Sequence, residues 1–382
     1  MQTVWSYNRS LTSRGVLWLG LKCDLRCKFC YDGNIAPTLK RWVKTQDLIT
    51  ALDRFRHFYG NRFIDFMGGE PTLHPDILLL IEHSASIGLL PTCITHALHL
   101  DQPEAVKRFV SAGIHDFLIS VHGIGRSART IHRVEYDTWK RQRRALGLIA
   151  ETGIQIRFNV TIIRDNVKQL SDIARTCVEV GGRIINFIAF NPYFEWQATT
   201  EIPFQIRHSE VVQHLIEAIE ICNSNGIEAN VRYMPLCMLP EYEKHVFTGY
   251  QLPYDPHEWD YNSWYDQGER GQQSRDWFFT ASEIQRLRHD YIRPDACADC
   301  SARKICDGLH IQYVKRWSTQ ELSPMSGTAI DDPTHFIRNQ RKLIYIDQSS
   351  VALPLRVAGT DEHLKATQFQ KKQNYRGGVK DD

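Results

Sequence analysis

The chain has 382 residues, with 46 Lys and Arg against 44 Asp and Glu and a formal net charge of +2. Its 42% hydrophobic and 24% charged residues exclude a disordered or fibrous chain, and the balanced charge gives no overall attraction to nucleic acid or anionic membranes. No apolar run approaches the ~18 residues of a membrane span. The first ten residues also lack the pattern of a signal peptide. We therefore expect a cytoplasmic protein that binds neither membranes nor nucleic acid.

Short apolar runs alternate with longer amphipathic segments through the first two hundred residues. Because parallel strands need crossover connections, six consecutive strand–helix units predict an α/β fold with a parallel sheet and outer helices. Six units are fewer than the eight of a closed barrel, so the sequence pattern is compatible with an open sheet or with an incomplete barrel. The predicted strands are 16–21, 63–67, 90–95, 117–121, 154–163 and 184–190. The predicted helices are 45–59, 75–87, 103–112, 138–152, 166–180 and 209–225.

The alternation stops after about residue 230. Residues 253–266 are rich in Tyr, Trp, Asp and Pro, which indicates either a pocket lining or the packing of a long loop. Asp255, Glu258 and Asp260 are candidates there for binding hydroxyl or ammonium groups, and 310–314 is strand-like. We divide the chain into a lead (1–14), a strand–helix unit (15–230), a cysteine-rich region (231–320) and a tail (321–382).

Three cysteines, Cys23, Cys27 and Cys30, follow the first predicted strand with C-x3-C-x2-C spacing. Three thiolates on one short loop suit a [4Fe-4S] cluster, which takes four ligands. No fourth protein ligand is nearby, so one iron is left open, as a catalytic cluster requires. Zinc and chance spacing are the alternatives, but zinc needs a fourth close ligand and the nearest histidine is His57.

Gly68, Gly69 and Glu70 follow the second predicted strand in the sequence Met-Gly-Gly-Glu-Pro. Two glycines let the backbone approach a ligand closely. The Glu70 carboxylate can accept a hydrogen bond from a ligand ammonium group. Alone, such a glycine pair is usually only a turn.

Together, the cysteine loop, with Phe29 before its third cysteine, and the Gly-Gly-Glu-Pro turn resemble the radical SAM superfamily over roughly residues 15–230. The resemblance implies a partial (β/α)6 barrel. It also implies a [4Fe-4S] cluster whose open iron binds the amino and carboxylate groups of S-adenosylmethionine (SAM). Reduction of that cluster cleaves SAM to methionine and a 5′-deoxyadenosyl radical, which abstracts a hydrogen from the substrate. Cys23, Cys27 and Cys30 carry over as iron ligands, and Gly68, Gly69 and Glu70 as the contact to the methionine amino group.

Further SAM contacts are expected beside the third cysteine and at the ends of the fourth and fifth strands. Phe29 is one candidate, and Ser120 and His122 lie where the family often contacts the ribose or carboxylate. Arg157 and Asn159 share one face of the fifth strand, and either suits the same groups. The alternative is that Arg157 is a satisfied barrel residue and His122 a loop histidine. The third strand departs from the family, because it ends in Thr-His-Ala where many relatives have Thr-Asn-Gly.

A second group of cysteines, Cys297, Cys300 and Cys306, needs a fourth ligand. Cys237, just before the insertion, is the best candidate, and His310 is the alternative. The arrangement resembles the twitch or abbreviated SPASM extension of radical SAM enzymes, which implies one fully ligated auxiliary [4Fe-4S] cluster. Structural zinc is the other possibility, since C-x2-C serves both metals. Cysteines on apolar runs, which are expected to be inert buried thiols, are Cys93, Cys177 and Cys222.

The resemblance implies an enzyme but not its substrate. We expect hydrogen abstraction from a small natural product or metabolite, with electrons from a flavodoxin- or ferredoxin-type partner. A ribosomal-peptide maturase is the alternative, although the 22 residues before Cys23 are too few for the peptide-binding module that such enzymes often carry. Aminocarboxypropyl transfer from SAM is a minor alternative. A non-enzymatic iron-sulfur or zinc protein is a third reading, which the Gly-Gly-Glu-Pro turn argues against.

Overall fold

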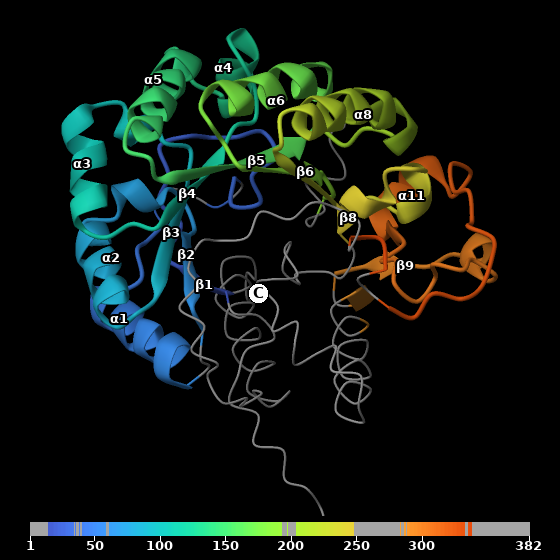
Figure 1. The fold of residues 1–382 in the computed structure, drawn as a ribbon, viewed down its shortest axis with the longest axis horizontal. Helices are drawn as coiled ribbons and strands as arrows, with labels where there is room; N and C mark the ends of the chain where they lie inside the picture. The colour runs from blue at the N-terminus through green and yellow to red at the C-terminus, as the bar shows by residue number, and fades with distance from the viewer. Residues whose placement is uncertain are drawn as a thin grey trace, which may run out of the picture.

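The computed structural model describes residues 14–33, 35, 38, 40–58, 61–192, 197, 204–247, 283, 286–287, 289–332 and 335–337. Their centre is one parallel eight-stranded sheet, in the order β1-β2-β3-β4-β5-β6-β7-β8, which curls with helices on its outer face (Figure 1). This curled sheet confirms the expected partial barrel. Over these ranges, no helix combines the length and the apolar character needed to cross a membrane. The aromatic-rich segment, with Asp255, Glu258 and Asp260, lies outside the described residues.

The six predicted strands are confirmed, with small shifts at their ends. Two further strands, β7 and β8, extend the sheet beyond the predicted units. β7 was not predicted because its sequence, Glu-Ala-Asn-Val-Arg, contains no apolar run. The strands are β1 (Arg14–Trp18), β2 (Phe63–Met67), β3 (Leu90–Thr95), β4 (Asp116–Ser120), β5 (Gln155–Ile162), β6 (Ile184–Ala189), β7 (Glu228–Arg232) and β8 (Val246–Phe247).

The helices pack on the convex side of the sheet (Figure 1). The predicted helix 45–59 is split, because its last turn is a π-helix, Arg54–Phe58. One short helix, α4, was not predicted, since its sequence contains few apolar residues. The helices are α1 (Thr45–Asp53), α2 (Ile77–Ser86), α3 (Pro103–Ser111), α4 (Arg126–His132), α5 (Thr138–Ala150), α6 (Leu170–Glu179), α8 (His208–Ser224) and α11 (Ile311–Trp317).

The two faces of the sheet differ in chemistry, because successive side chains of a strand point to opposite sides. The helix-facing side chains form the hydrophobic core, and the largest are Phe66, Phe117, Phe158 and Phe187. Cys93, Cys177 and Cys222 also lie in this core, as expected for buried thiols. The opposite, concave face carries polar side chains: Asp65, Thr92, Asp116, Arg157, Asn159, Thr161, Asn186 and Asn230. The concave face is therefore suited to binding a polar ligand.

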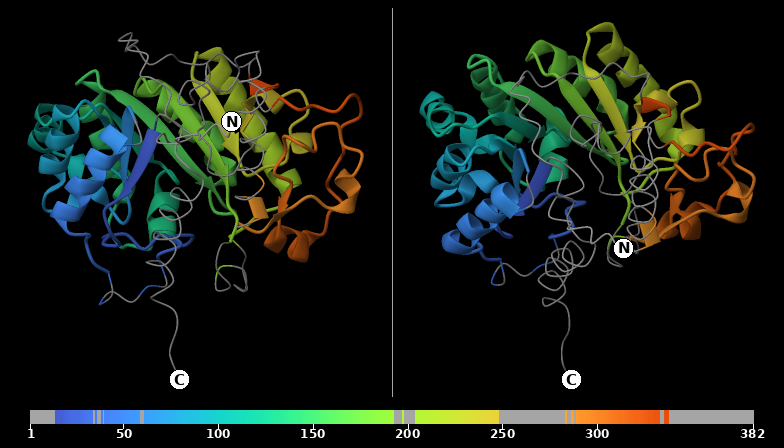
Figure 2. Two further views of the ribbon diagram at one scale, coloured as in Figure 1. Left: turned by 90° about the horizontal axis from the view of Figure 1, so that it is seen from below. Right: turned by 60° about the horizontal axis from the view of Figure 1, so that its bottom comes forward.

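The cysteine-rich extension lies beside the β7–β8 end of the sheet, away from α1 to α3 (Figure 2). It contains a small antiparallel pair, β9 (Tyr291–Ile292) and β10 (Leu309–His310), followed by α11. The strand predicted at 310–314 is therefore wrong. His310 is the N-cap of α11, and its Nδ1 accepts a hydrogen bond from the Gln312 N–H at 3.2 Å. This cap and the packing of the helix outweigh the strand preference of Ile and Val.

Aromatic contacts join the extension to the barrel. The His208 ring, at the start of α8, stacks on Tyr313 of α11 with ring centroids 4.2 Å apart. The backbone N–H of His208 donates to the Tyr313 hydroxyl at 2.8 Å. Next to β6, the Asn191 amide donates to the Tyr291 hydroxyl at 2.9 Å. The extension is therefore held against the sheet by buried contacts.

Candidate functional site

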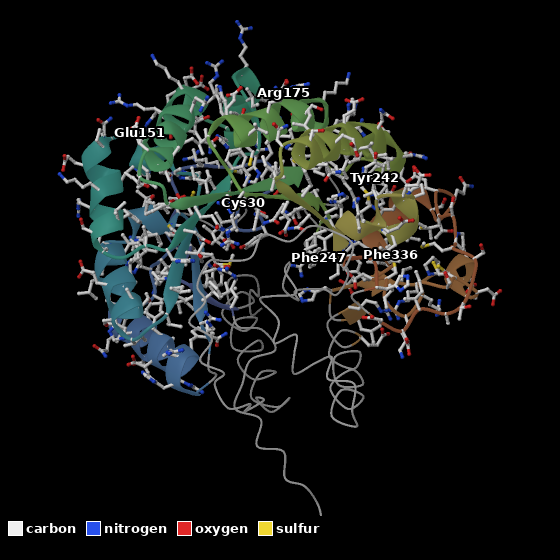
Figure 3. The ribbon with its side chains drawn as sticks, viewed as in Figure 1. Cys30, Glu151, Arg175, Tyr242, Phe247 and Phe336 are labelled. Carbon is white, nitrogen blue, oxygen red and sulfur yellow. The ribbon has the colours of Figure 1, made fainter. Side chains whose placement is uncertain are left out.

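The loop with Cys23, Cys27 and Cys30 follows β1 at the carboxyl edge of the sheet, where barrels of this type place their chemistry. Figure 3 shows Cys30 on the concave side. Burial, and then the charge of Glu70, raise the pKa of Cys23 to about 12. Burial, and then Cys30, raise the pKa of Cys27 well above its ordinary value. These thiols are neutral on their own, whereas a coordinated cation would deprotonate them.

The Gly-Gly-Glu turn lies directly against this loop. Gly68 and Gly69 have φ values of 96° and 54°, which favour glycine. A Cβ on Gly69 would lie 2.1 Å from the carbonyl oxygen of Lys22, the residue before the first cysteine. The Glu70 N–H donates to the same oxygen at 2.8 Å. The structure thus brings the two sequence motifs into contact.

The Glu70 carboxylate is 1% exposed and joins the ends of β2 and β3. Its Oε1 accepts hydrogen bonds from the Thr72 N–H and hydroxyl and from the Thr95 hydroxyl, at 3.1, 2.6 and 2.5 Å. Its Oε2 accepts from the His96 N–H at 3.0 Å. Oε1 is saturated by its three donors, and Oε2 also lies 3.2 Å from His96 Nε2, so a ligand ammonium group would have to share or displace a His96 contact at Oε2. The contact of Glu70 with SAM stays a prediction.

His96 and His99, which sequence analysis did not assign, bind Asp24 inside the cysteine loop. His96 Nε2 and His99 Nε2 lie 2.9 and 3.0 Å from the two Asp24 oxygens. Burial opposes ionisation, but these hydrogen bonds hold the pKa of Asp24 well below its usual range. The donor atoms of Cys23, Asp24 and His96 lie within 4.8 Å of one another. The turn after β3 that departs from the family pattern therefore anchors the cysteine loop.

Four of the expected SAM contacts gather near this edge of the sheet. The Phe29 ring packs edge-on against His122, with centroids 4.7 Å apart. The Thr161 N–H donates to His122 Nδ1 at 3.1 Å, and burial lowers the pKa of His122 to about 3, so the ring is neutral with its proton on Nε2. Ser120, the last residue of β4, is the register partner of Asn159. Asn159 Oδ1 is buried with no hydrogen-bond partner in the described part of the chain, which leaves it free to accept from a ligand.

Arg157 lies nearer the opposite, amino end of the sheet. Its side chain is 5% exposed and donates to Asp116 at 3.0 Å and to Thr92 at 3.3 Å. Asp116 is the first residue of β4, far from the cysteine loop along the strand. The contact of Arg157 with SAM stays a prediction, and these hydrogen bonds favour the alternative of a satisfied barrel residue.

Cys237, Cys297, Cys300 and Cys306 line one cavity together with Arg293 and Arg303. Backbone N–H groups of Met325 and Gly308 point at the sulfurs of Cys300 and Cys306, each at 3.4 Å. Burial raises the pKa of Cys306 to about 12. Four sulfurs with N–H donors and two nearby cations fit a metal centre with thiolate ligands. His310, the alternative fourth ligand, does not line this cavity and caps α11 instead.

The family profile described as the Radical SAM superfamily matches residues 19–177, which include the cysteine loop and the Gly-Gly-Glu turn. The chain carries a radical SAM domain. Proteins of this superfamily bind a [4Fe-4S] cluster and SAM. The three thiols of the first loop fit such a cluster, and they are the residues in the radical SAM domain that would hold it.

Known relatives match the domain rather than the whole chain. The AdoMet-dependent heme synthase of Nitratidesulfovibrio vulgaris is 26% identical over 173 residues, 45% of this chain and 47% of that protein. The PqqA peptide cyclase of Methylocella silvestris is 24% identical over 182 residues, 46% of each chain. The chain thus spans about half the length of the curated relatives it matches.

A solved structure matches more of the chain. Streptococcus suis SuiB bound to S-adenosylmethionine superposes with a TM-score of 0.53 at 17% identity, covering 84% of this chain and 77% of SuiB. At this identity the likeness shows the fold alone, and it agrees with the curled parallel sheet.

Proposed function

We propose that this chain is a radical SAM enzyme that cleaves SAM reductively and abstracts a hydrogen atom from its substrate, aided by an auxiliary [4Fe-4S] cluster. The observation that carries the proposal is the contact between the three-cysteine loop and the Gly-Gly-Glu turn at the carboxyl edge of the sheet. A protein that only carries electrons has no need for such a turn beside its metal ligands.

The side chains around the loop have distinct tasks. When bound, the cluster supplies the electron that cleaves SAM to methionine and the 5′-deoxyadenosyl radical. Cys23, Cys27 and Cys30 hold it, while Gly68 and Gly69 keep the backbone free of side chains where the cofactor must approach. The buried contacts of Glu70 fix the turn, which preorganises the site before SAM binds.

Phe29 and His122 help to shield the site from water. Phe29 packs against His122 and Phe190, and its carbonyl oxygen accepts a hydrogen bond from Gln197 at 2.9 Å. Because burial keeps His122 neutral, its Nε2–H is a donor without a positive charge. Exclusion of water matters here, since a carbon radical must meet only its substrate.

The second site suits a fully ligated cluster. Its four cysteines come from two segments, Cys237 beside the barrel and Cys297 to Cys306 in the extension. With four protein ligands it has no open position for SAM, so we assign it to electron transfer or to support of the fold. We propose the extension, within residues 231–320, as a twitch- or SPASM-like unit.

For the substrate, we propose a small natural product or metabolite that binds on the polar concave face of the sheet. A peptide is the second candidate, and specific comparisons favour it. PqqA peptide cyclases are among the relatives, and SuiB, whose fold covers 84% of this chain, has a structure bound to precursor peptide SuiA.

The activity is tested on anaerobically reconstituted protein. We expect about eight iron per chain and release of 5′-deoxyadenosine from SAM and dithionite, identified by mass spectrometry. Cys27→Ala should abolish release, whereas Cys222→Ala, which changes a buried core thiol outside both sites, should not. Methylthioadenosine would show aminocarboxypropyl transfer instead. About four iron plus zinc would make the second site structural.

The substrate class is tested with deuterated pools of small metabolites and of peptides. Hydrogen abstraction transfers deuterium from the substrate to 5′-deoxyadenosine. If deuterium reaches 5′-deoxyadenosine only from the peptide pool, the small-molecule proposal is wrong and the substrate is a peptide.

A further inference from the structure

Exposed cations gather on α4 and on the adjoining cysteine loop. Arg126 and Arg129 lie one turn apart on the same face of α4, and Arg133 is the left-handed C-cap of that helix. Lys22 and Arg26 flank the first cysteine on the loop. All five side chains are exposed. We call these five residues the basic surface.

The basic surface is bonded to the loop that holds the first site. The Arg26 N–H donates to the His132 carbonyl oxygen, and the Lys28 N–H donates to the Ile131 carbonyl oxygen, each at 3.0 Å. His132 and Ile131 end α4 and are fully buried. The cations of α4 therefore sit on a rigid connection next to Cys23 and Cys27.

The basic surface is not neutralised by its surroundings. None of its five residues has an ion pair with any residue that the structure describes, whereas the neighbouring Lys28 is paired with Asp165 at 2.8 Å. Of the nearby anions, Asp24 is bound by two histidines and Asp137 caps α5. The third, Glu135, is exposed. The three carboxylates balance at most three of the five positive charges, so the basic surface keeps an excess of positive charge.

This excess works against the stability of α4. Like charges three or four residues apart on a helix repel by a few tenths of a kcal/mol per pair. Arg126 and Arg129 form one such pair, whereas Arg133 lies just outside the regular helix as its C-cap. Exposed cations that have no ion pair among the described residues are available to an external partner of opposite charge.

The chemistry of the first site indicates what that partner is. Its cluster must receive electrons from outside the chain, one at a time. Electron-transfer complexes are small and short-lived, and opposite charges raise their association rates by orders of magnitude. A basic surface on the loop that holds the cluster is well placed for such an encounter.

We propose that the basic surface is the docking site of an acidic electron-donor protein, an inference that rests on the proposed function. One electron leaves the reduced centre of the donor, which is thereby oxidised, and enters the first cluster, which is reduced. No proton or group is transferred.

The test compares two reductants on the reconstituted full chain. One is a recombinant flavodoxin with its reductase and NADPH, and the other is dithionite, which needs no docking surface. The variant Arg129→Glu/Arg133→Glu reverses two charges. Lys107→Glu/Arg108→Glu on α3 is the matched control, since both residues are exposed and lie away from the loop. The readout is the rate of SAM cleavage at low and high salt.

We expect the Arg129→Glu/Arg133→Glu variant to lose about tenfold or more of the flavodoxin-driven rate at low salt, and to lose its salt dependence. Its dithionite-driven rate should stay that of the parent, and Arg129→Lys/Arg133→Lys should keep both rates. The control should behave as the parent with both reductants.

Three results would overturn the docking site. They are an unchanged flavodoxin rate, an equal loss with dithionite, and binding of nucleic acid by the parent that the charge reversal abolishes while the flavodoxin rate persists. If the parent does not cleave SAM with dithionite, the proposed function itself fails, so the two failures are distinguishable.

Discussion

Replacement of Arg157 by Met separates a role in the fold from a role in SAM binding. The guanidinium and the Asp116 carboxylate are 3.0 Å apart, and the two residues are 5% and 0% exposed. Removing one partner of a buried ion pair costs about 3–5 kcal/mol, because the other charge is left unpaired. Burial opposes ionisation of Asp116, but Arg157 and Arg14 keep its pKa low. Since Arg14 remains in the variant, we expect the lower end, about 3 kcal/mol.

Unfolding of anaerobic protein by urea and by heat gives the measurement. For a chain of 382 residues, a loss of about 3 kcal/mol corresponds to a fall in melting temperature of roughly 4 °C. The double variant Arg157→Met/Asp116→Asn removes both charges and should recover most of the loss. The KM for SAM should change little in either variant. An unchanged unfolding midpoint together with a large rise in the KM for SAM would show that Arg157 serves the cofactor after all.

Three more changes test the sites and the join between barrel and extension. Gly69→Ala places a Cβ 2.1 Å from a backbone carbonyl of the cysteine loop and should lower both SAM cleavage and iron content. Gly181→Ala is the control for backbone strain alone, because Gly181 has a φ of 66° and open space around it. Equal losses in the two variants would contradict the contact. Cys237→Ala should lower iron from about eight to about four per chain, and an unchanged content would remove this ligand. Burial lowers the pKa of His208 from 6.5 to about 4, so stability that is complete above pH 6.5 falls by about 3 kcal/mol as the pH drops to 4. His208→Phe keeps the ring stack on Tyr313 and should lose this part of the pH dependence in urea unfolding, whereas an unchanged dependence would contradict the assignment.

The sequence was informative about the fold where local patterns dominate. Strands with apolar runs, such as Phe63–Met67, were predicted with their observed ends. Glu228–Arg232 was missed because three of its five residues are polar, and only pairing with β6 makes it a strand. The strand predicted at 310–314 was wrong because the cap at His310 starts a helix.

The candidate site was predictable where spacing alone carries the chemistry. The cysteine loop and the Gly-Gly-Glu turn are short motifs, and their contact follows from both lying at the carboxyl edge of neighbouring strands. Alternation along the strand placed Arg157 and Asn159 on one face correctly, but it did not give their positions relative to the site. The roles of His96 and His99 depend on contacts with a residue more than seventy positions away, which no local pattern reveals.

The two sets of cysteines also leave the ribosome at different stages of synthesis. The first set is contained in one loop, and all its members exist before most of the sheet has been made. The auxiliary set is complete only after β1 to β8, because Cys297 follows Cys237 by about sixty residues. A nascent chain that stops within this interval carries the whole first set but a single thiol of the second. A metal at the second site could therefore be fully ligated only after the strands of the barrel have been made. Because closure entropy grows slowly with loop length, the interval between Cys237 and Cys297 can lengthen at little cost in free energy.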